Sequence, residues 1–242
     1  MKKIDLNFQV MKYVGAITLI IFLLSSCGIC IEGEGVEADE TRELEAFSEL
    51  EIDIDADVVI HIGDQASIDI SAQENLLDII RTDIRRGKLI IDADPCISSN
   101  YPIYIDITTA SLSYIKLNGS ADITVIDELH SDDFEMKING SGNITTDVFT
   151  NDLKIEINGS GNVMISGSAK DADIVINGSG DVRAAMLQAY QADIKINGSG
   201  NTGINALNDL KVTVKGSGDV KYSGDPSVKT SISGSGSVTK IN

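Results

Sequence analysis

The sequence predicts an all-β protein, a parallel β-helix or β-solenoid with coils of about 19 residues. Two observations support this prediction. A corner of the type Asn-Gly-Ser-Gly recurs at nearly constant spacing, and apolar residues alternate with polar residues before each corner. One strand pattern returning with one turn pattern at a fixed period is typical of stacked coils.

The corner is marked by a Gly that precedes Ser, and it occurs seven times along the second half of the chain. Successive copies lie 21, 19, 19, 20, 18 and 18 residues apart. Copies at such regular intervals indicate a structural repeat and not an accident of composition. The corner glycines are Gly119, Gly140, Gly159, Gly178, Gly198, Gly216 and Gly234.

A strand is expected before each corner. In the second copy Phe134, Met136 and Ile138 are apolar, and the residues between them are charged. Alternation with period two predicts a strand with one face in a core. A shorter alternation follows the corner, as at Ile144 and Thr146, and a return segment of variable length completes the coil. At a strand spacing of about 4.8 Å, seven stacked coils would form a rod on the order of 35 Å long.

The corner residues have structural roles in such a fold. Gly adopts positive φ at low steric cost, which permits the sharp bend. Asn side chains that stack coil on coil can hydrogen-bond in a ladder, and the corner serines are expected to form a second ladder. The predicted ladder residues are Asn118, Asn139, Asn158, Asn177, Asn197, Ser141, Ser160, Ser179 and Ser199.

Two other all-β folds fit less well. An antiparallel barrel of hairpins predicts turns every 8–12 residues with two different turn chemistries, whereas one chemistry recurs here. A left-handed β-helix of hexapeptide repeats would need an apolar residue at every sixth position, and that phase does not persist.

The N-terminal residues 1–26 are predicted to be a lipoprotein signal peptide. Lysines precede the apolar run VGAITLIIFLL of residues 14–24, which is too short to span a bilayer comfortably. The run ends in Leu-Ser-Ser-Cys, which resembles a lipobox, so Cys27 is the predicted lipidation site and acyl chains the membrane attachment. Residues 27–43 are rich in Gly and Glu and are predicted to be a flexible tether.

The remaining chain is expected to form one continuous unit, residues 44–242. Residues 44–116 keep the alternation without the exact repeat and are predicted to be diverged β-coils or a cap, whereas residues 117–242 form the regular repeat. The segment ENLLDIIRTDIRR of residues 74–86 fits either a helical turn or a strand.

Cys30 and Cys96 could pair in an exported protein, but two unpaired thiols are favoured because Cys30 lies in the expected tether.

The charge of the chain limits its partners. The formal net charge is −18, and removal of residues 1–26, which hold three Lys and one Asp, leaves −20. Such a surface disfavours binding to nucleic acid and to anionic lipid headgroups.

Several segments together resemble a known family. The opening FSELEIDIDADVVIHIG of residues 47–63, the strand LIIDAD of residues 89–94 and the recurring ING corners resemble the DUF2807 family, which is common in Bacteroidetes and described as putative auto-transporter adhesins with a head GIN domain. The resemblance covers roughly residues 44–240. It implies a right-handed parallel β-helix similar in shape to pectin lyases, a location in the cell envelope and a role in adhesion. The family offers no catalytic residues to carry over.

The sequence indicates no catalytic residue, metal site or cofactor. Glycoside-cleaving sites need clustered carboxylates in contrasting environments, but the acidic residues lie mostly on outward strand positions or at corners. Asp122, Asp181 and Asp219 follow the corner where other copies have Asn, which favours a structural role over calcium binding. His61 and His130 form no evident constellation with other groups.

The functional expectation is a lipid-anchored β-solenoid of the cell envelope, in the outer membrane, with a non-catalytic binding, adhesion or scaffold role. Its partners would be an envelope or host-surface protein or glycan, bound by the variable return segments. The alternative is a carbohydrate-active β-helix enzyme of the polysaccharide lyase or hydrolase type. The leaflet, surface exposure and oligomeric state stay open.

Overall fold

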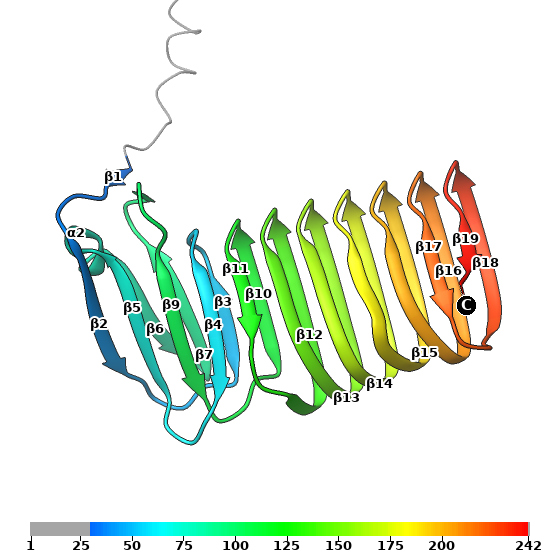
Figure 1. The fold of residues 1–242 in the computed structure, drawn as a ribbon, viewed down its shortest axis with the longest axis horizontal. Helices are drawn as coiled ribbons and strands as arrows, with labels where there is room; N and C mark the ends of the chain where they lie inside the picture. Colours follow the sequence, from blue (N-terminus) through cyan, green and yellow to red (C-terminus); the bar gives the residue numbers. More distant parts are fainter. Residues whose placement is uncertain (1–29, 242) are drawn as a thin grey trace, which may run out of the picture.

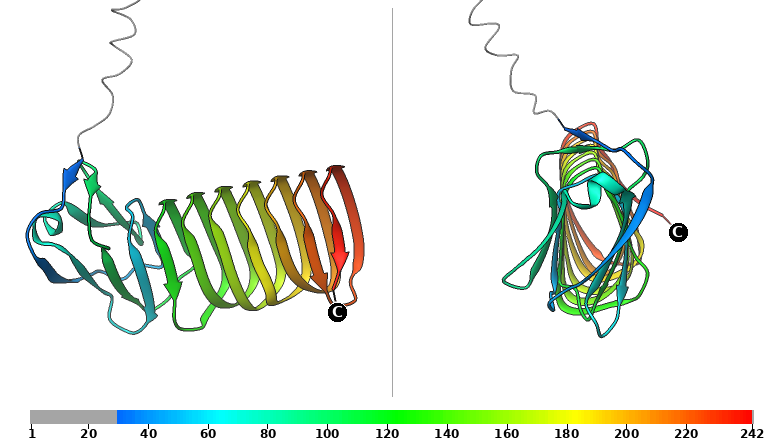
Figure 2. Two further views of the ribbon diagram at one scale, coloured as in Figure 1. Left: turned by 45° about the horizontal axis from the view of Figure 1, so that its top comes forward. Right: turned by 90° about the vertical axis from the view of Figure 1, so that its left-hand side faces the viewer.

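The computed structural model describes residues 30–241 and shows a stack of β-coils with a cap at its N-terminal end (Figure 1). Seventeen strands join into one hydrogen-bonded sheet that winds through the stack. Figure 2 shows that the coils are flattened and lie over one another when the stack is viewed from its N-terminal end. The β-solenoid predicted from the sequence is therefore confirmed.

The regular part of the stack begins with the short strands on either side of the first corner. Each later strand up to β16 contains the return segment of one coil and the residues that lead to the next corner. It stays one strand because the chain bends between these parts without losing its pairing to the neighbouring coil. The strands are β10 (Tyr114–Gly119), β11 (Asp122–Val125), β12 (Leu129–Gly140), β13 (Asn143–Gly159), β14 (Asn162–Gly178), β15 (Val182–Gly198), β16 (Thr202–Gly216), β17 (Val220–Ser223), β18 (Ser227–Gly234) and β19 (Val238–Lys240).

Neighbouring coils pair in parallel with equivalent residues side by side. Ile157 of β13 pairs with Ile176 of β14, and Ile176 pairs with Ile196 of β15. All three side chains have 0% of their surface exposed. The alternating pattern of one coil therefore places its apolar side chains directly over those of the previous coil, and the stack shares one core.

The N-terminal part mixes partial coils with antiparallel strands. β3 and β4 pair in parallel with β10 and β11 of the first regular coil, and β7 and β9 extend these layers. Antiparallel pairs of β2 with β5, β5 with β9 and β6 with β7 end the stack. The elements are β1 (Ile31–Glu32), β2 (Glu37–Glu43), β3 (Glu49–Ile52), β4 (Asp57–Ile62), β5 (Ser67–Gln73), α2 (Glu74–Leu77), β6 (Ile80–Arg85), β7 (Lys88–Ala93), β8 (Ile97–Ser98) and β9 (Tyr104–Thr109).

The ambiguous segment of residues 74–86 contains both alternatives, since the single turn α2 precedes strand β6. Leu76 and Leu77 of α2 are buried and close the end of the core. Arg42 of β2 closes it further, because its guanidinium donates hydrogen bonds to the carbonyl oxygens of Leu77 at 2.9 Å and Ile80 at 2.8 Å and pairs with Glu40. A cation thus satisfies backbone acceptors at the end of the cap.

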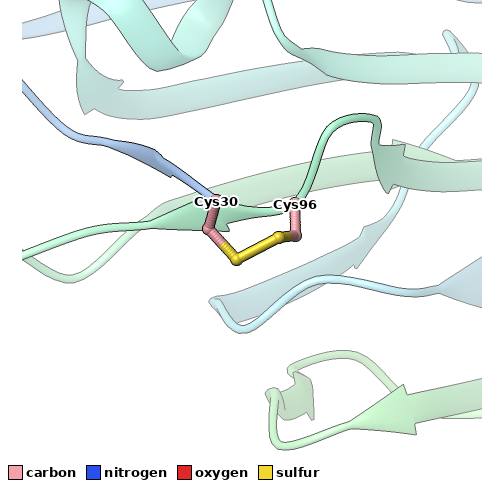
Figure 3. Close-up of a disulfide and its surroundings, with 2 residues drawn as sticks. All are labelled: Cys30 and Cys96. Atoms are coloured by element: carbon pink, nitrogen blue, oxygen red, sulfur yellow. A yellow bond between two sulfur atoms is a disulfide. The ribbon is translucent and has the colours of Figure 1, made fainter. Parts of the chain in front are cut away.

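The prediction of a flexible tether over residues 27–43 is wrong for the described part, residues 30–43. These residues form β1, which pairs with β8, and β2, which runs antiparallel to β5 over its full length. The preference for unpaired thiols is also wrong, because Cys30 and Cys96 form a disulfide (Figure 3). The acidic composition of this segment reflects an exposed edge strand, with long-range contacts that a local pattern does not reveal.

The predicted signal peptide of residues 1–26 and the lipidation site Cys27 lie outside the described residues. Among residues 30–241, no helix is both long enough and apolar enough to cross a membrane.

Candidate functional site

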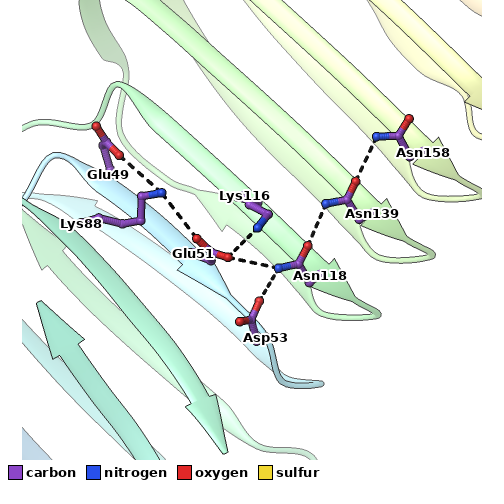
Figure 4. A network of polar contacts seen from close by, with 8 residues as sticks. All are labelled: Glu49, Glu51, Asp53, Lys88, Lys116, Asn118, Asn139 and Asn158. Carbon is purple, nitrogen blue, oxygen red and sulfur yellow. Dashed lines mark hydrogen bonds and ion pairs between the residues drawn. The ribbon is translucent and has the colours of Figure 1, made fainter. Parts of the chain in front are cut away.

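The asparagines of five corners form a continuous ladder along the stack, part of which is shown in Figure 4. From Asn139 onward, each side-chain amide donates a hydrogen bond to the Oδ1 of the Asn one coil earlier. The bonds are Asn139 to Asn118 at 2.8 Å, Asn158 to Asn139 at 3.0 Å, Asn177 to Asn158 at 2.9 Å and Asn197 to Asn177 at 2.8 Å. At the next corners Lys215 and Ser233 occupy the same register position.

The corner serines differ from the expectation of a second side-chain ladder. Within residues 30–241, no hydroxyl of one corner Ser bonds to that of another. Their backbone N–H groups bond instead to the corner Gly carbonyl one coil earlier, as for Ser141 to Gly119 at 2.8 Å and Ser160 to Gly140 at 2.9 Å. The backbone, and not the serine hydroxyls, therefore makes the contact between coils at this position.

A second ladder of side chains runs two residues after the corner serines. Asn143 donates to the Oδ1 of Asp122 at 2.6 Å, and Asn201 donates to the Oδ1 of Asp181 at 3.0 Å. The backbone N–H of Asp219 donates to the Oδ1 of Asn201 at 3.0 Å. Asp and Asn both occur in this row because each needs only to offer an acceptor to the next coil, so these carboxylates act as parts of the stack.

The corners as a whole are thus occupied by contacts between coils. Binding of an external ligand needs a surface with free polar groups, and the structure has one beside the return segments. A groove with a volume of about 1120 Å³ runs along the stack from Glu49 and Lys88 near the cap to Lys229 in the last coil. It crosses β10, β12, β13, β14, β15, β16 and β18 where each strand rises from its return segment.

The first row of side chains in the groove is mainly acidic. It contains, in register from coil to coil, Asp133, Asp152, Asp171, Gln191 and Asp209. Each lies seven residues before a corner Gly, so a search for residues at a constant offset in the repeat would have found the row. Like charges stacked at strand spacing repel one another. Among residues 30–241, Asp171 alone in this row has a Lys Nζ within 4.0 Å, that of Lys170.

The second row contains both acidic and basic side chains. It contains Tyr114, Glu135, Lys154, Asp173, Asp193, Lys211 and Lys229 in register. Lys154 Nζ lies 2.8 Å from Glu135 Oε1, and Lys211 Nζ lies 2.8 Å from Asp193 Oδ2. These hydrogen bonds raise the pKa of Lys154 and the pKa of Lys211, so both ammonium groups are held in their charged form.

The other oxygen of Asp193, Oδ1, is buried and has no hydrogen-bond partner within the described residues. A buried acceptor without a donor is costly, so Asp193 carries one unsatisfied oxygen at the edge of the groove.

A charged cluster around Glu51 lies beside the cap end of the groove (Figure 4), which Glu49 and Lys88 of this cluster line. Burial raises the pKa of Glu51, but hydrogen bonds from Lys116 at 2.6 Å and Lys88 outweigh it and lower the pKa overall. Lys88 also lies 5.1 Å from the ring centroid of Tyr114. Burial raises the pKa of the Tyr114 phenol, which therefore stays protonated at neutral pH.

The two histidines lie at separate places. His61 lies between Asp106 and Asp127, with its ring nitrogens 3.5 and 3.6 Å from their carboxylates. The ring of His130 stacks on Phe149 at a centroid distance of 5.0 Å. No group of three or more His, Cys, Asp or Glu among residues 30–241 is arranged to hold a metal ion.

A family model described as "Putative auto-transporter adhesin, head GIN domain" (DUF2807) matches residues 46–226. No curated protein matches the chain.

The fold is also found in solved structures of Bacteroidetes proteins. A putative adhesin from Bacteroides fragilis superposes with a TM-score of 0.83 at 21% identity, covering 87% of this chain and 100% of that one. A putative adhesin from Parabacteroides merdae has a TM-score of 0.76 at 19% identity, with 89% and 100% coverage. A putative lipid binding protein from Parabacteroides distasonis has a TM-score of 0.72 at 22% identity, with 88% and 100% coverage. Similarity at this identity establishes the shared fold.

Proposed function

Because the chain belongs to the DUF2807 family of putative auto-transporter adhesins, we propose that it is a non-catalytic binding module of the cell envelope that holds an extended ligand along its groove. The observation that carries this proposal is the groove itself, which follows the axis of the stack past several coils. Stacked coils present the same outward position at regular intervals, which suits an extended polymer or a long strand of another protein. The ligand class is an envelope or host-surface protein or glycan.

The charges of the groove support binding over catalysis. A general acid needs a carboxyl with a raised pKa, and a general base needs a group near neutrality. Instead, ion pairs hold Lys154 and Lys211 charged, and burial keeps Tyr114 protonated. Such groups are suited to hydrogen bonds and ion pairs with a ligand. In the first row, the carboxylates of Asp133 and Asp152 have no side-chain partner among the described residues and are available for donors of an amine, amide or hydroxyl type.

The anchor proposed for this module is a lipid on Cys27, at the outer membrane. The support is the Leu-Ser-Ser-Cys pattern behind a signal-length apolar run. Replacement Cys27→Ala should abolish acylation and recovery in the membrane fraction, and unchanged membrane recovery would refute the anchor. Protease shaving of whole cells then distinguishes a surface-facing module, which is degraded, from a periplasmic one.

The binding proposal is tested with the chain carrying Cys27→Ser, screened against bacterial and host polysaccharides and against envelope proteins crosslinked in intact cells. For the ligand retained most strongly, Asp171→Lys should lower affinity at least about tenfold, because it reverses the charge in the middle of the groove. The matched control Asp147→Lys changes an exposed carboxylate outside the groove and should leave affinity unchanged.

Equal loss in both variants would show that total charge, and not the groove, determines binding. Release of a cleaved polysaccharide product that Asp171→Lys abolishes would overturn the non-catalytic proposal in favour of a carbohydrate-active enzyme.

A further inference from the structure

The last coil exposes residues that every earlier coil buries. Val228 and Ile232 of β18 are 36% and 43% exposed, whereas Leu210 and Val214, at the same register one coil earlier, are 1% and 0% exposed. β18 pairs with β16 on one side, and among residues 30–241 no strand pairs with its other side. Within residues 30–241, this coil therefore presents an apolar surface bordered by backbone groups that no described strand pairs.

The two ends of the stack are built differently. The edge strand β2 at the cap has five charged residues among seven, and Arg42 and α2 close the core behind it. Natural edge strands commonly use such inward charges to prevent pairing with another chain. β18 has one charged residue among eight, Lys229, and contains no Pro. Its edge therefore lacks the features that would prevent pairing.

Electrostatics also single out this end. The last coil, residues 225–241, contains Asp225, Lys229 and Lys240, of which Lys240 and Asp225 form an ion pair at 2.5 Å. The large negative charge of the chain is therefore carried by the rest of the molecule. Copies of the chain repel one another at every acidic surface, but two last coils can approach with little repulsion.

We propose that a second copy of this chain covers the open end, with the two β18 strands antiparallel about a two-fold axis at Thr230. Val228, Thr230 and Ile232 share the inward face of β18. The proposed register places Val228 against Ile232 of the partner subunit and the two Thr230 residues against each other.

The outward face is equally self-complementary in this register. Lys229 faces Ser231 of the partner subunit, so no like charges stand directly opposite. Aliphatic pairs and Thr–Thr pairs stabilise antiparallel strands, whereas directly opposed like charges destabilise them. A two-fold arrangement of one surface on itself is the most common symmetry of protein dimers.

Head-to-tail stacking is the competing arrangement. The acidic cap would attract the weakly basic end, but the charged residues of β2 disfavour strand pairing there, and α2 and Arg42 leave no apolar surface for Val228 and Ile232. Head-to-tail contacts along the stack axis also do not form a closed assembly, and they would produce filaments of unlimited length. The end of one coil is about 26 Å long and about 10 Å across, smaller than a standard interface, so the proposed dimer is weak and reversible.

Sedimentation equilibrium of the chain with Cys27→Ser, up to about 1 mM, tests the proposal. A monomer–dimer equilibrium that stops at the dimer supports it, whereas a monomer throughout or a continuing series of larger species overturns it. Thr230→Arg places two guanidinium groups opposite each other and should weaken the dimer more than about tenfold. The control Met186→Lys changes an apolar side chain that is 69% exposed on β15, and it should leave the dimer intact.

Crosslinking tests the register directly. Directly opposed residues of antiparallel strands have Cα atoms about 4.5–5.5 Å apart, within the range that a disulfide spans. Thr230→Cys should therefore form a disulfide-linked dimer under mild oxidation. Ser231→Cys, which faces Lys229 of the partner subunit, should give at least about tenfold less. Equal crosslinking of both variants, or none with Thr230→Cys, would contradict the proposed register.

Discussion

Gly159 lies directly over Gly140 in the stack, and a Cβ added to Gly159 would be 2.2 Å from the carbonyl oxygen of Gly140. Gly159 also has a φ of +141°. The corner glycine is therefore required twice, for the bend of its own coil and for the approach of the next coil.

Gly159→Ala should lower the free energy of unfolding by about 3 kcal/mol or more, because it combines backbone strain with a clash against backbone. The matched control is Gly203→Ala in β16. There a Cβ would meet only the Cβ of Ala185 at 3.9 Å, an ordinary contact. The control should change stability by less than about 1 kcal/mol. Thermal and urea unfolding followed by circular dichroism measure both, and equal losses would contradict the stacking argument.

The Asn ladder should show a graded response to truncation. Asn139→Ala removes a bond donated to Asn118 and one accepted from Asn158, and it should cost about 2 kcal/mol. Asn197→Ala removes only the bond donated to Asn177 and should cost about 1 kcal/mol.

The control for this series is Asn208→Ala, because the exposed Asn208 bonds only to its neighbour Asp209 and should be near neutral. Urea unfolding of the three variants ranks them, and an Asn197 variant that is as destabilised as the Asn139 variant would argue against a chain of equivalent bonds.

Loss of the Cys30–Cys96 disulfide should destabilise the cap. The bond joins residues 66 positions apart, and closing such a loop restricts the unfolded chain by about 3–4 kcal/mol. Cys96→Ser should therefore lower the melting temperature, and a reducing agent should lower that of the parent to the same value. The reducing agent should leave the variant itself unchanged. A parent that melts at the same temperature with and without reducing agent would contradict this prediction.

Glu156 links stability to pH. The amide of Asn158 at 2.7 Å, and then Lys137 at 2.9 Å, lower the pKa of this carboxyl below its usual value of 4.5. A lowered pKa in the folded state adds stability that is present above pH 4.5 and is lost as the pH falls through the folded-state pKa. The difference in free energy of unfolding between the parent and Glu156→Gln should therefore be larger at pH 7 than near pH 3, with the parent the more stable.

Urea unfolding of both chains across this pH range measures the difference. Asn158→Ala and Lys137→Ala should each flatten the profile, since each removes a hydrogen bond that lowers the pKa of Glu156. A stability difference between the parent and Glu156→Gln that is constant with pH would contradict the linkage.

The repeat made much of the fold predictable. Residues such as Ile157 and Ile176 alternate with polar residues at a fixed period, so their burial and their register follow from local patterns. β2 could not be predicted in this way. Its sequence EADETRE has the composition of a disordered segment, and it is held by distant partners, β5 along its length and the carbonyl oxygens that Arg42 reaches.

The groove was missed for a related reason. Asp133 and Asp152 recur at one offset in the repeat, but period-two alternation marks them only as outward-facing. Whether outward side chains stand on a ridge or in a hollow depends on the bend between each return and the following strand, which the return segments determine in three dimensions. The corner motif, by contrast, is a purely local pattern, so its position and its role in the bend can be predicted from the sequence.

The disulfide in the cap also determines how the molecule responds to tension. Tension applied to the chain before Cys30 is transmitted to Cys96 through the disulfide, and also through the pairing of the short strand β1 with β8. β2 is therefore not peeled from β5 one hydrogen bond at a time, as an unlinked edge strand would be. The force enters the chain at Cys96, between β7 and β8, and β2 carries little of it. A module built to hold onto something under flow would gain mechanical resistance from this single crosslink.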